Sequence, residues 1–293
     1  MQFLTKREYS AIQKALRQRP HEVPFNSVWE KIYVDLGVGI NVGQKLILGN
    51  DDFFIMRKYA TKVSESDPLS QDSGRLDRFE AASRFKDEKW ADKNVFANTM
   101  RVNVREGRVP TTNGQAVTPP GTLLTIDATD LDVTQIHNVV IVENGIVAMH
   151  WDRCRIPQAL ESALMVYRGH GSETATVRQW LNCLPAETGL VGYFDFDPAG
   201  LALAVDYGVD AILVPQPFPD VRGASPGNKP EAYRVQIEHR PNLLDELPEG
   251  WKSILAWMMA DQRECAVTQE RITVDGRTLQ LVDAQTGNEV VFE

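Results

Sequence analysis

Four short apolar runs, separated by stretches of helical pattern, most constrain the fold of this 293-residue chain. They cover residues 139–142, 163–167, 190–194 and 211–214. Continuous apolar strands of this length are typical of a sheet that is covered on both faces, and their alternation with helices predicts parallel pairing. We therefore expect an α/β fold in the C-terminal half, with a parallel sheet flanked by helices.

Charged side chains follow three of these runs. Glu143 comes directly after the first run, Arg168 and His170 follow the second, and Asp195 and Asp197 follow the third. In open parallel sheets, ligands bind at the carboxyl ends of the strands. The sequence therefore predicts a functional site at this edge of the sheet.

The two aspartates stand in the segment Asp-Phe-Asp-Pro-Ala-Gly, residues 195–200. Alternate side chains of an extended segment share a face, so the two carboxylates are expected to lie close together and to repel each other unless a cation or a proton separates them. A simpler interpretation makes Asp197 the N-cap of a helix that begins at Pro198, and Asp195 a loop residue. Capping accounts for only one carboxylate, whereas Glu143, Asp195 and Asp197 together suggest a metal site.

Carboxylate oxygens favour Mg²⁺ or Mn²⁺ over zinc. The three cysteines, Cys154, Cys183 and Cys265, are far apart and lack the spacing of a zinc site, so we expect a reduced cytoplasmic protein in which they are buried. The sequence contains no signal-peptide pattern and no apolar run of about 20 residues, which predicts no contact with a membrane.

Charge is distributed unevenly along the chain, although the net charge is −9. Residues 1–19 contain five basic side chains and one acidic one, and residues 75–108 contain nine basic and six acidic side chains. A basic N-terminal half suits a phosphate backbone, and Lys6 and Arg7 are candidate contacts. The alternative is an ordinary solvated helix face.

The N-terminal elements have clear helix starts. Thr5 with Glu8 and Ser27 with Glu30 each form a capping-box pattern, and a third helical pattern begins at Asp51. We expect a mainly helical, winged-helix-like α+β domain that binds DNA.

The expected domain limits follow from composition. The proline- and glycine-containing stretch of residues 107–121 predicts a boundary. We therefore expect a DNA-binding domain over residues 1–120, the parallel-sheet domain over 121–220, and a C-terminal segment over 221–293 that packs on it.

A glutamate after one strand and an Asp-x-Asp after a later strand resemble the Toprim domain of topoisomerases, bacterial primases and several nucleases. The segment at 195–200 is similar to the motif of the topoisomerase VI A subunit. Residues 142–144 (Val-Glu-Asn) and 269–272 (Gln-Glu-Arg-Ile) resemble the JetD/MksG-type nuclease subunit of Wadjet-type SMC plasmid-defence systems.

This resemblance implies a divalent-metal-dependent DNA endonuclease. Glu143, Asp195 and Asp197 would be its catalytic and metal-binding residues, with Mg²⁺ or Mn²⁺ as cofactor. From their place at the neighbouring strand end, Arg168 or His170 would contact the phosphate; the alternatives are a surface ion pair for Arg168 and a turn residue without a role for His170. On the resemblance, Glu270 would be an accessory acid, and the alternative is a residue on the surface of a helix.

The resemblance also implies partners: DNA, and SMC- and kleisin-type subunits of an anti-plasmid or anti-phage complex. A homodimer is expected because a two-fold pair matches the symmetry of duplex DNA. Topoisomerase VI relatives use a tyrosine nucleophile, whereas Tyr9, Tyr33 and Tyr59 have no matching context here. Hydrolysis is therefore expected rather than transesterification.

Two other functions remain open. One is a non-catalytic DNA-binding or assembly subunit with a degenerate Toprim fold. The other is a HAD-type phosphatase, which also places Asp-x-Asp after a strand but has Thr or Val where this chain has Ala199. The apolar helix pattern at residues 251–259 suits either a docking surface or the core, and the core is the commoner use.

Overall fold

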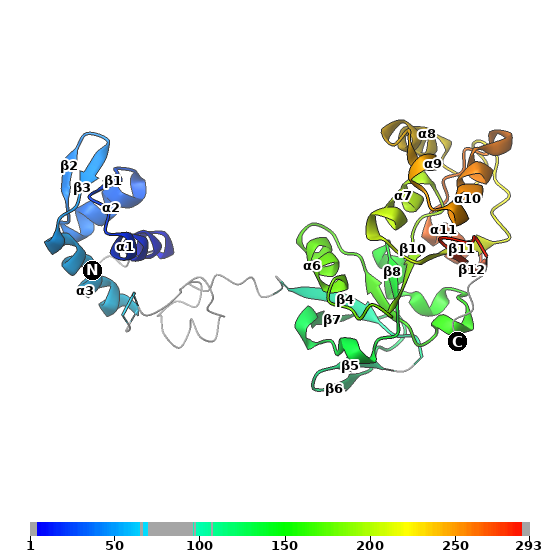
Figure 1. Ribbon diagram of the computed structural model, residues 1–293, viewed down its shortest axis with the longest axis horizontal. Helices are drawn as coiled ribbons and strands as arrows, with labels where there is room; N and C mark the ends of the chain where they lie inside the picture. Colours follow the sequence, from blue (N-terminus) through cyan, green and yellow to red (C-terminus); the bar gives the residue numbers. More distant parts are fainter. Residues whose placement is uncertain (1–4, 65–66, 70–95, 97, 107, 289–293) are drawn as a thin grey trace. The chain divides into compact units, whose positions relative to one another are not determined.

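A computed structural model describes residues 5–64, 67–69, 96, 98–106 and 108–288. The chain divides into two compact units, Met1–Val95 and Phe96–Glu293 (Figure 1). The basic side chains at residues 75–95 lie outside the described residues.

The first unit combines helices with a small antiparallel sheet. Its elements are α1 (Lys6–Gln18), β1 (Glu22–Pro24), α2 (Ser27–Leu36), β2 (Ile40–Val42), β3 (Lys45–Ile47) and α3 (Asn50–Ser64). The strands are ordered β1-β3-β2, and both pairings are antiparallel. Ile12, Ile32, Leu46 and Met56 are fully buried in its core.

Helix starts in this unit follow the capping chemistry, with one shift. The backbone N–H of Thr5 donates to Glu8 Oε2 at 2.7 Å, as the capping box predicts. In α2 the cap is Asn26 instead of Ser27, because its Oδ1 accepts from the N–H groups of Val28 and Trp29. A strand separates α1 from α2 and a hairpin separates α2 from α3, so the described part of this unit has no helix–turn–helix pair.

The second unit is a mixed α/β structure. Its strands are β4 (Thr99–Asn103), β5 (Val109–Thr111), β6 (Gly114–Ala116), β7 (Leu124–Asp127), β8 (Asn138–Val142), β9 (Leu164–Tyr167), β10 (Gly189–Tyr193), β11 (Ala211–Gln216) and β12 (Thr278–Asp283). Its α-helices are α5 (Gly145–Met149), α6 (Ser172–Leu181), α7 (Pro198–Tyr207), α8 (Pro230–His239), α9 (Leu243–Glu246), α10 (Glu249–Met259) and α11 (Gln269–Val274).

Seven strands form one sheet, ordered β12-β11-β10-β8-β9-β4-β7. The four apolar runs predicted from the sequence are its central strands β11, β10, β8 and β9, and they pair in parallel. The outer strands β12, β4 and β7 pair antiparallel, so the sheet is mixed. Figure 1 shows helices α7 to α11 beside the β10–β12 side of the sheet, and α6 beside β4.

The expected boundary at residue 120 is wrong. Residues 99–103 form β4, which pairs with β9 and therefore belongs to the large sheet. The stretch at 107–121 contains the β5–β6 hairpin, which bridges to Leu131 within the second unit. The C-terminal segment is likewise part of this unit, because β12 completes the sheet beside β11.

The core of the second unit includes the apolar face of α10. Trp251 and Met258 are fully buried, and Ile254 and Leu255 are nearly so. Trp251 Nε1 donates to the carbonyl oxygen of Val282, which ties α10 to β12. The core interpretation of residues 251–259 is therefore confirmed.

Among the described residues, no helix has the length and apolar character to cross a bilayer.

Candidate functional site at the carboxyl ends of β8 and β10

Two neighbouring strands bring Glu143 and Asp195 together. β8 and β10 pair in register up to Val142 opposite Tyr193, so the residues after them leave the sheet at the same edge. The N–H of Glu143 donates to the Tyr193 carbonyl oxygen at 3.2 Å, and the N–H of Asp195 donates to Glu143 Oε2 at 3.3 Å. The Glu143 side chain thus lies against the backbone of Asp195.

Asp197 is the N-cap of α7, as the capping interpretation predicted. Its Oδ1 accepts from the N–H of Gly200 at 2.7 Å, and its Oδ2 accepts from Gln236 Nε2 at 2.8 Å. Pro198 occupies the first helical turn, where its missing N–H has no cost. Burial raises the pKa of the Asp197 carboxyl group, although the two donors oppose the shift.

Gly200 permits the tight turn between the strand and the helix. A Cβ atom at this position would lie 2.0 Å from the Asp195 carbonyl oxygen, which no side chain can occupy. The close approach holds the Asp195–Asp197 segment against the first turn of α7. The glycine of the motif is therefore a requirement of backbone packing.

The carboxyl group of Asp195 is strongly perturbed. Burial, together with the negative charges of Asp197, Glu143 and Glu270, raises its pKa to about 7. A hydrogen bond from the N–H of Gln269 to Asp195 Oδ1, at 2.8 Å, opposes this shift. Titratable groups perturbed by burial and like charge are typical of functional sites, and such a cluster favours a cation or a proton.

Arg168 provides positive charge at the same edge. Its guanidinium group donates to Glu143 Oε1 at 3.1 Å, and both side chains are about three-quarters buried. Its Nε atom is buried and has no hydrogen-bond partner among the described residues. His170 is exposed, and its ring lies edge-on against Tyr167. In the described part of the chain, no hydrogen bond or ion pair joins the His170 side chain to the carboxylates.

The segment that begins α11 completes the site. Phe196 and Val267 exchange two backbone hydrogen bonds, at 2.8 and 3.1 Å, which attach this segment beside the Asp195–Asp197 turn. Glu270 Oε1 accepts from Asn144 Nδ2 at 2.6 Å, while Glu270 Oε2 is buried without a partner among the described residues. Glu270 thus joins the other carboxylates.

Sequence reasoning did not assign a role to Gln269. This residue is fully buried, and its Nε2 donates to the Tyr193 carbonyl oxygen at 2.6 Å. The only signal for it was the Gln-Glu-Arg-Ile resemblance, because no local pattern predicts a contact between residues this far apart in sequence.

Lys6 and Arg7 lie in the first unit, at the start of α1. Lys6 is half-buried, whereas Arg7 is exposed on the same helix as Lys14. These side chains belong to the first unit and the carboxylates to the second, so Lys6 and Arg7 are described as a candidate surface of their own unit.

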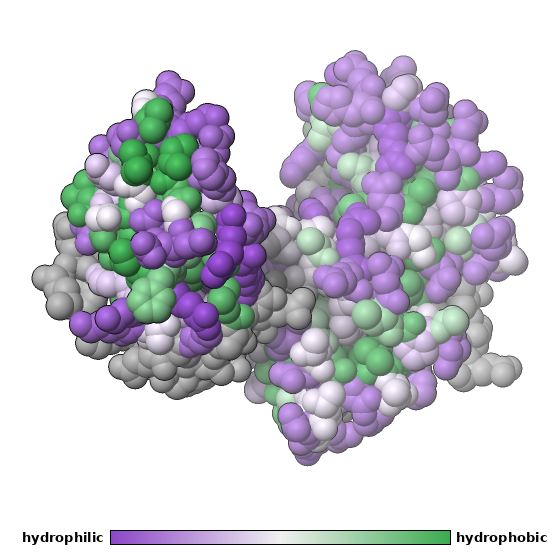
Figure 2. Space-filling model, turned by 60° about the vertical axis from the view of Figure 1, so that its left-hand side comes forward, coloured by the Kyte–Doolittle hydropathy of each residue, from purple (hydrophilic) through white to green (hydrophobic). Residues whose placement is uncertain are grey.

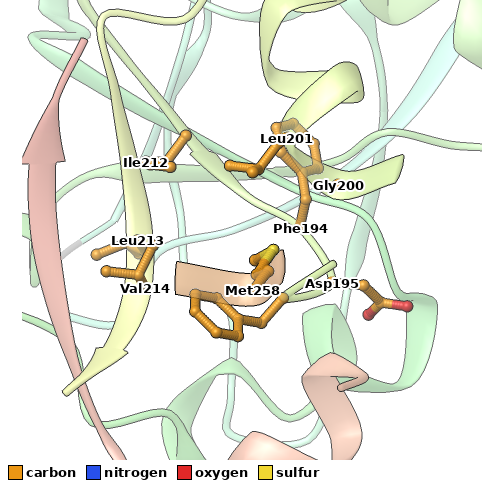
Figure 3. Close-up of a pocket in the computed structure, with 9 residues that line it drawn as sticks. Phe194, Asp195, Gly200, Leu201, Ile212, Leu213, Val214 and Met258 are labelled. Atoms are coloured by element: carbon orange, nitrogen blue, oxygen red, sulfur yellow. The ribbon is translucent and has the colours of Figure 1, made fainter. Parts of the chain in front are cut away.

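A small cavity lies behind the Asp195 backbone, between the turn that follows β10, the helices α7 and α10, and β11 (Figure 3). Its walls are mostly apolar and include Phe194, Leu201, Val214 and Met258. Figure 3 shows the Asp195 carboxylate turned away from these side chains. The cavity holds about 10 Å³, close to the minimum for one water molecule, so it is not a substrate pocket.

The donor set fits a hard divalent cation in its chemistry. All four acidic groups offer oxygen, their charges raise the pKa of Asp195, and Glu270 Oε2 is buried without a partner among the described residues. Within the described ranges, however, no three His, Cys, Asp or Glu side chains are arranged to hold a metal ion. Glu143 is turned toward Arg168 and Asp197 toward Gln236, so the residues present suit a cation once these contacts rearrange.

The fold defines a mixed α/β protein with an acidic site at the carboxyl edge of its sheet. The chain belongs to the family described as Domain of unknown function (DUF7281), whose model matches residues 97–281. This match covers the large sheet except the last two residues of β12, and it includes every segment that forms the site. A search of curated proteins finds no match to the chain.

Proposed function

We propose that this protein is a divalent-metal-dependent DNA endonuclease of Toprim type that hydrolyses phosphodiester bonds. The observation that carries the proposal is the meeting of Glu143 and Asp195 at the ends of two adjacent parallel strands. Asp197 and Glu270 add charge to the same cluster, and burial holds the pKa of Asp195 near 7. A buried cluster of carboxylates offers the oxygen ligands that a hard divalent cation prefers.

Asp195, Asp197 and Glu143 would hold Mg²⁺ or Mn²⁺, with Glu270 as an accessory acid. A bound ion of this kind polarises a phosphoryl oxygen and lowers the pKa of its water. Glu143 is the candidate general base, because its Oε2 lies beside the Asp195 N–H at the open end of the strands. Arg168 is the candidate phosphate contact, since its Nε is buried without a partner among the described residues.

The first unit would bind DNA through the basic face of α1, where Arg7 and Lys14 are exposed. The proposed biological setting is an SMC-like anti-plasmid complex, in which this chain is the nuclease subunit and acts as a homodimer. Figure 2 shows hydrophobic surface on the first unit, and the exposed apolar side chains of this unit support an interaction role. They are Val34, Ile40, Val42, Phe54 and Ile55.

A second candidate is a non-catalytic DNA-binding or assembly subunit. The ion pair between Arg168 and Glu143 favours it, because a neutralised glutamate has less need of a cation. The two candidates differ in one measurable property, which is the dependence of DNA cleavage on Asp195.

The test is nicking of a supercoiled plasmid by the full chain in Mg²⁺ or Mn²⁺. We expect Asp195→Ala to reduce the rate on the order of 100-fold or more, because the variant lacks a central carboxylate. The matched control is Asp220→Ala, which removes an exposed aspartate of the same unit. Equal cleavage by the wild type and Asp195→Ala contradicts the proposal, and absence of cleavage by the wild type favours the assembly role.

A further inference from the structure

The Gln269 side chain connects the ends of the two strands that carry the acidic site. Its Nε2 donates to the carbonyl oxygen of Tyr193, the last residue of β10, at 2.6 Å. Its Oε1 accepts from the N–H of Asn144, two residues after the end of β8, at 2.8 Å. One amide therefore supplies the donor and the acceptor that the two strand ends require as they leave the sheet.

The same residue also contacts the central carboxylate. The backbone N–H of Gln269 donates to Asp195 Oδ1 at 2.8 Å. The Asn144 side chain returns a contact, since its Nδ2 donates to Glu270 Oε1 at 2.6 Å. We refer to these contacts among Asn144, Gln269 and Glu270 as the strand-end clasp.

Attachment of the C-terminal segment does not by itself account for the clasp. The Phe196–Val267 backbone pair already fixes this segment to the turn. The Gln269 side-chain amide and backbone N–H bond to Asp195 Oδ1, to Tyr193 and to the residue after Glu143, while the backbone carbonyl oxygen of Gln269 accepts from Thr273 Oγ1 within α11. Each partner of the amide and of the N–H is thus a site residue or lies within two residues of one.

We propose that Gln269 is a positioning residue that sets the orientation of Asp195 and the spacing of the Glu143 and Asp195 strand ends. This inference rests on the proposed function, because it assigns to Gln269 the geometry of a divalent-cation site. With Oδ1 of Asp195 held by a backbone N–H, the second oxygen is left for the cation. Outer partners of metal ligands commonly contribute about 10- to 100-fold to metal affinity or activity.

The experiment measures Mn²⁺ binding to the full chain by electron paramagnetic resonance of free Mn²⁺, together with the Mn²⁺ concentration that gives half-maximal plasmid nicking. Gln269→Glu keeps the shape of the side chain but removes the donor to Tyr193. We expect its Mn²⁺ affinity to fall about 10-fold or more, with a matching rise in the half-saturating Mn²⁺ concentration. Gln179→Glu is the control, because it makes the same charge change at an exposed position of α6.

Circular dichroism and thermal unfolding without Mn²⁺ establish that each variant is folded. If Gln269→Glu does not fold, Gln269→Met, which is close to it in size and uncharged, takes its place in the same titration. Mn²⁺ affinity within twofold of the wild type in the folded variant overturns the role of Gln269 alone. Failure of the wild type to bind Mn²⁺ in an Asp195-dependent manner overturns the proposed function and this inference together.

Discussion

The two units of this protein place their charges in opposite settings. In the first unit, Arg7 and Lys14 stand in solvent on one helix, and the buried core is apolar apart from a few hydrogen-bonded groups. In the second unit, Asp195 and Asp197 are withdrawn from solvent at the edge of the sheet.

The two settings suit different tasks: exposed charges suit the attraction of an oppositely charged partner, and buried charges suit cation binding. Exposed charges are screened by salt and act together over several ångströms, which suits contact with a polyanion. Charges in a partly dry site shift their own pKa and exclude one another, which suits cation binding and proton transfer. We expect substitutions in the two units to alter different measurements.

Gly200→Ala should have the largest effect on stability, and this effect should be confined to the second unit. The added Cβ would lie 2.0 Å from the Asp195 carbonyl oxygen, so the turn must open, and we expect the free energy of unfolding of the second unit to fall by about 3 kcal/mol. Plasmid nicking should be lost, while DNA binding by α1 is retained. The measurements are urea unfolding and a gel-shift assay.

The control for this prediction is Gly208→Ala at the C-cap of α7. Gly208 has a φ of +63°, and apart from its own chain neighbours no atom of the described residues lies within 4 Å of an added Cβ, so only backbone strain of about 1 kcal/mol is expected. Equal losses in the two variants would mean that the contact with Asp195 has no special weight.

Asp195→Asn should change how the free energy of unfolding of the second unit depends on pH. The pKa of Asp195 is about 7 in the folded protein and near 4 in the unfolded chain. Between about pH 4 and about pH 7, the folded state therefore keeps a proton on Asp195 that the unfolded state has lost. The free energy of unfolding of the wild type should therefore fall as the pH rises from about 4 to about 7. The asparagine variant lacks the part of this fall that Asp195 contributes, while Asp197, whose pKa is also raised, keeps its own part. The variant should be more stable than the wild type by about 2 kcal/mol at pH 8 without divalent cations; the difference is limited because water still reaches part of the Asp195 carboxyl group.

Thermal and urea unfolding across this pH range in EDTA measure that effect. Added Mn²⁺ should stabilise the wild type and leave the variant unchanged, because ligand binding to the folded state raises its stability. Asp220→Asn, at an exposed position, should follow the wild-type pH profile. A wild-type profile that is flat over the range contradicts the burial of Asp195 as a charged group.

Replacement of both Arg7 and Lys14 by alanine tests the first unit. We expect DNA affinity to fall about tenfold at low salt, and the slope of log affinity against log salt to decrease by about 2, because two phosphate contacts are removed. Fluorescence anisotropy with a DNA duplex across a salt series measures both values. Nicking at saturating protein should be unchanged, and an unchanged salt slope would place the DNA contacts elsewhere.

Phe54→Ser should have the smallest effect on stability. This side chain is 70% exposed, so we expect the free energy of unfolding to change by less than about 0.5 kcal/mol. Its neighbour Phe53 is 5% exposed, and Phe53→Ala should cost about 3 to 5 kcal/mol. Urea unfolding of both variants tests whether the apolar surface of this unit is free of a structural role, as a docking surface requires.

The sequence predicted the central strands because their periodicity is local. Residues 139–142 and 190–194 are continuously apolar, and this pattern alone indicates burial on both faces. The addition of β4 and β12 to the sheet was missed, because pairing partners far apart in the chain leave no local mark. The boundary at residue 120 was placed at a proline- and glycine-containing hairpin, which is a turn inside the second unit.

The site was predicted in part for the same reason. Glu143 and Asp195 were found from their positions after apolar strands, and the structure brings them into contact. The contacts of Gln269 with Tyr193 and Asn144 arise from tertiary packing, so only a resemblance pointed toward them. His170 follows the same strand as Arg168, yet it is exposed and its ring packs edge-on against Tyr167.

The strand-end clasp has a consequence for the order in which the protein matures. Asp195 is held by a residue that the ribosome adds 74 positions later. Domains generally fold as units during synthesis, with the N-terminal unit first. The first unit, which contains α1, is therefore expected to fold before residue 269 has been added, so that Asp195 lacks this hydrogen bond until the α11 segment has been made.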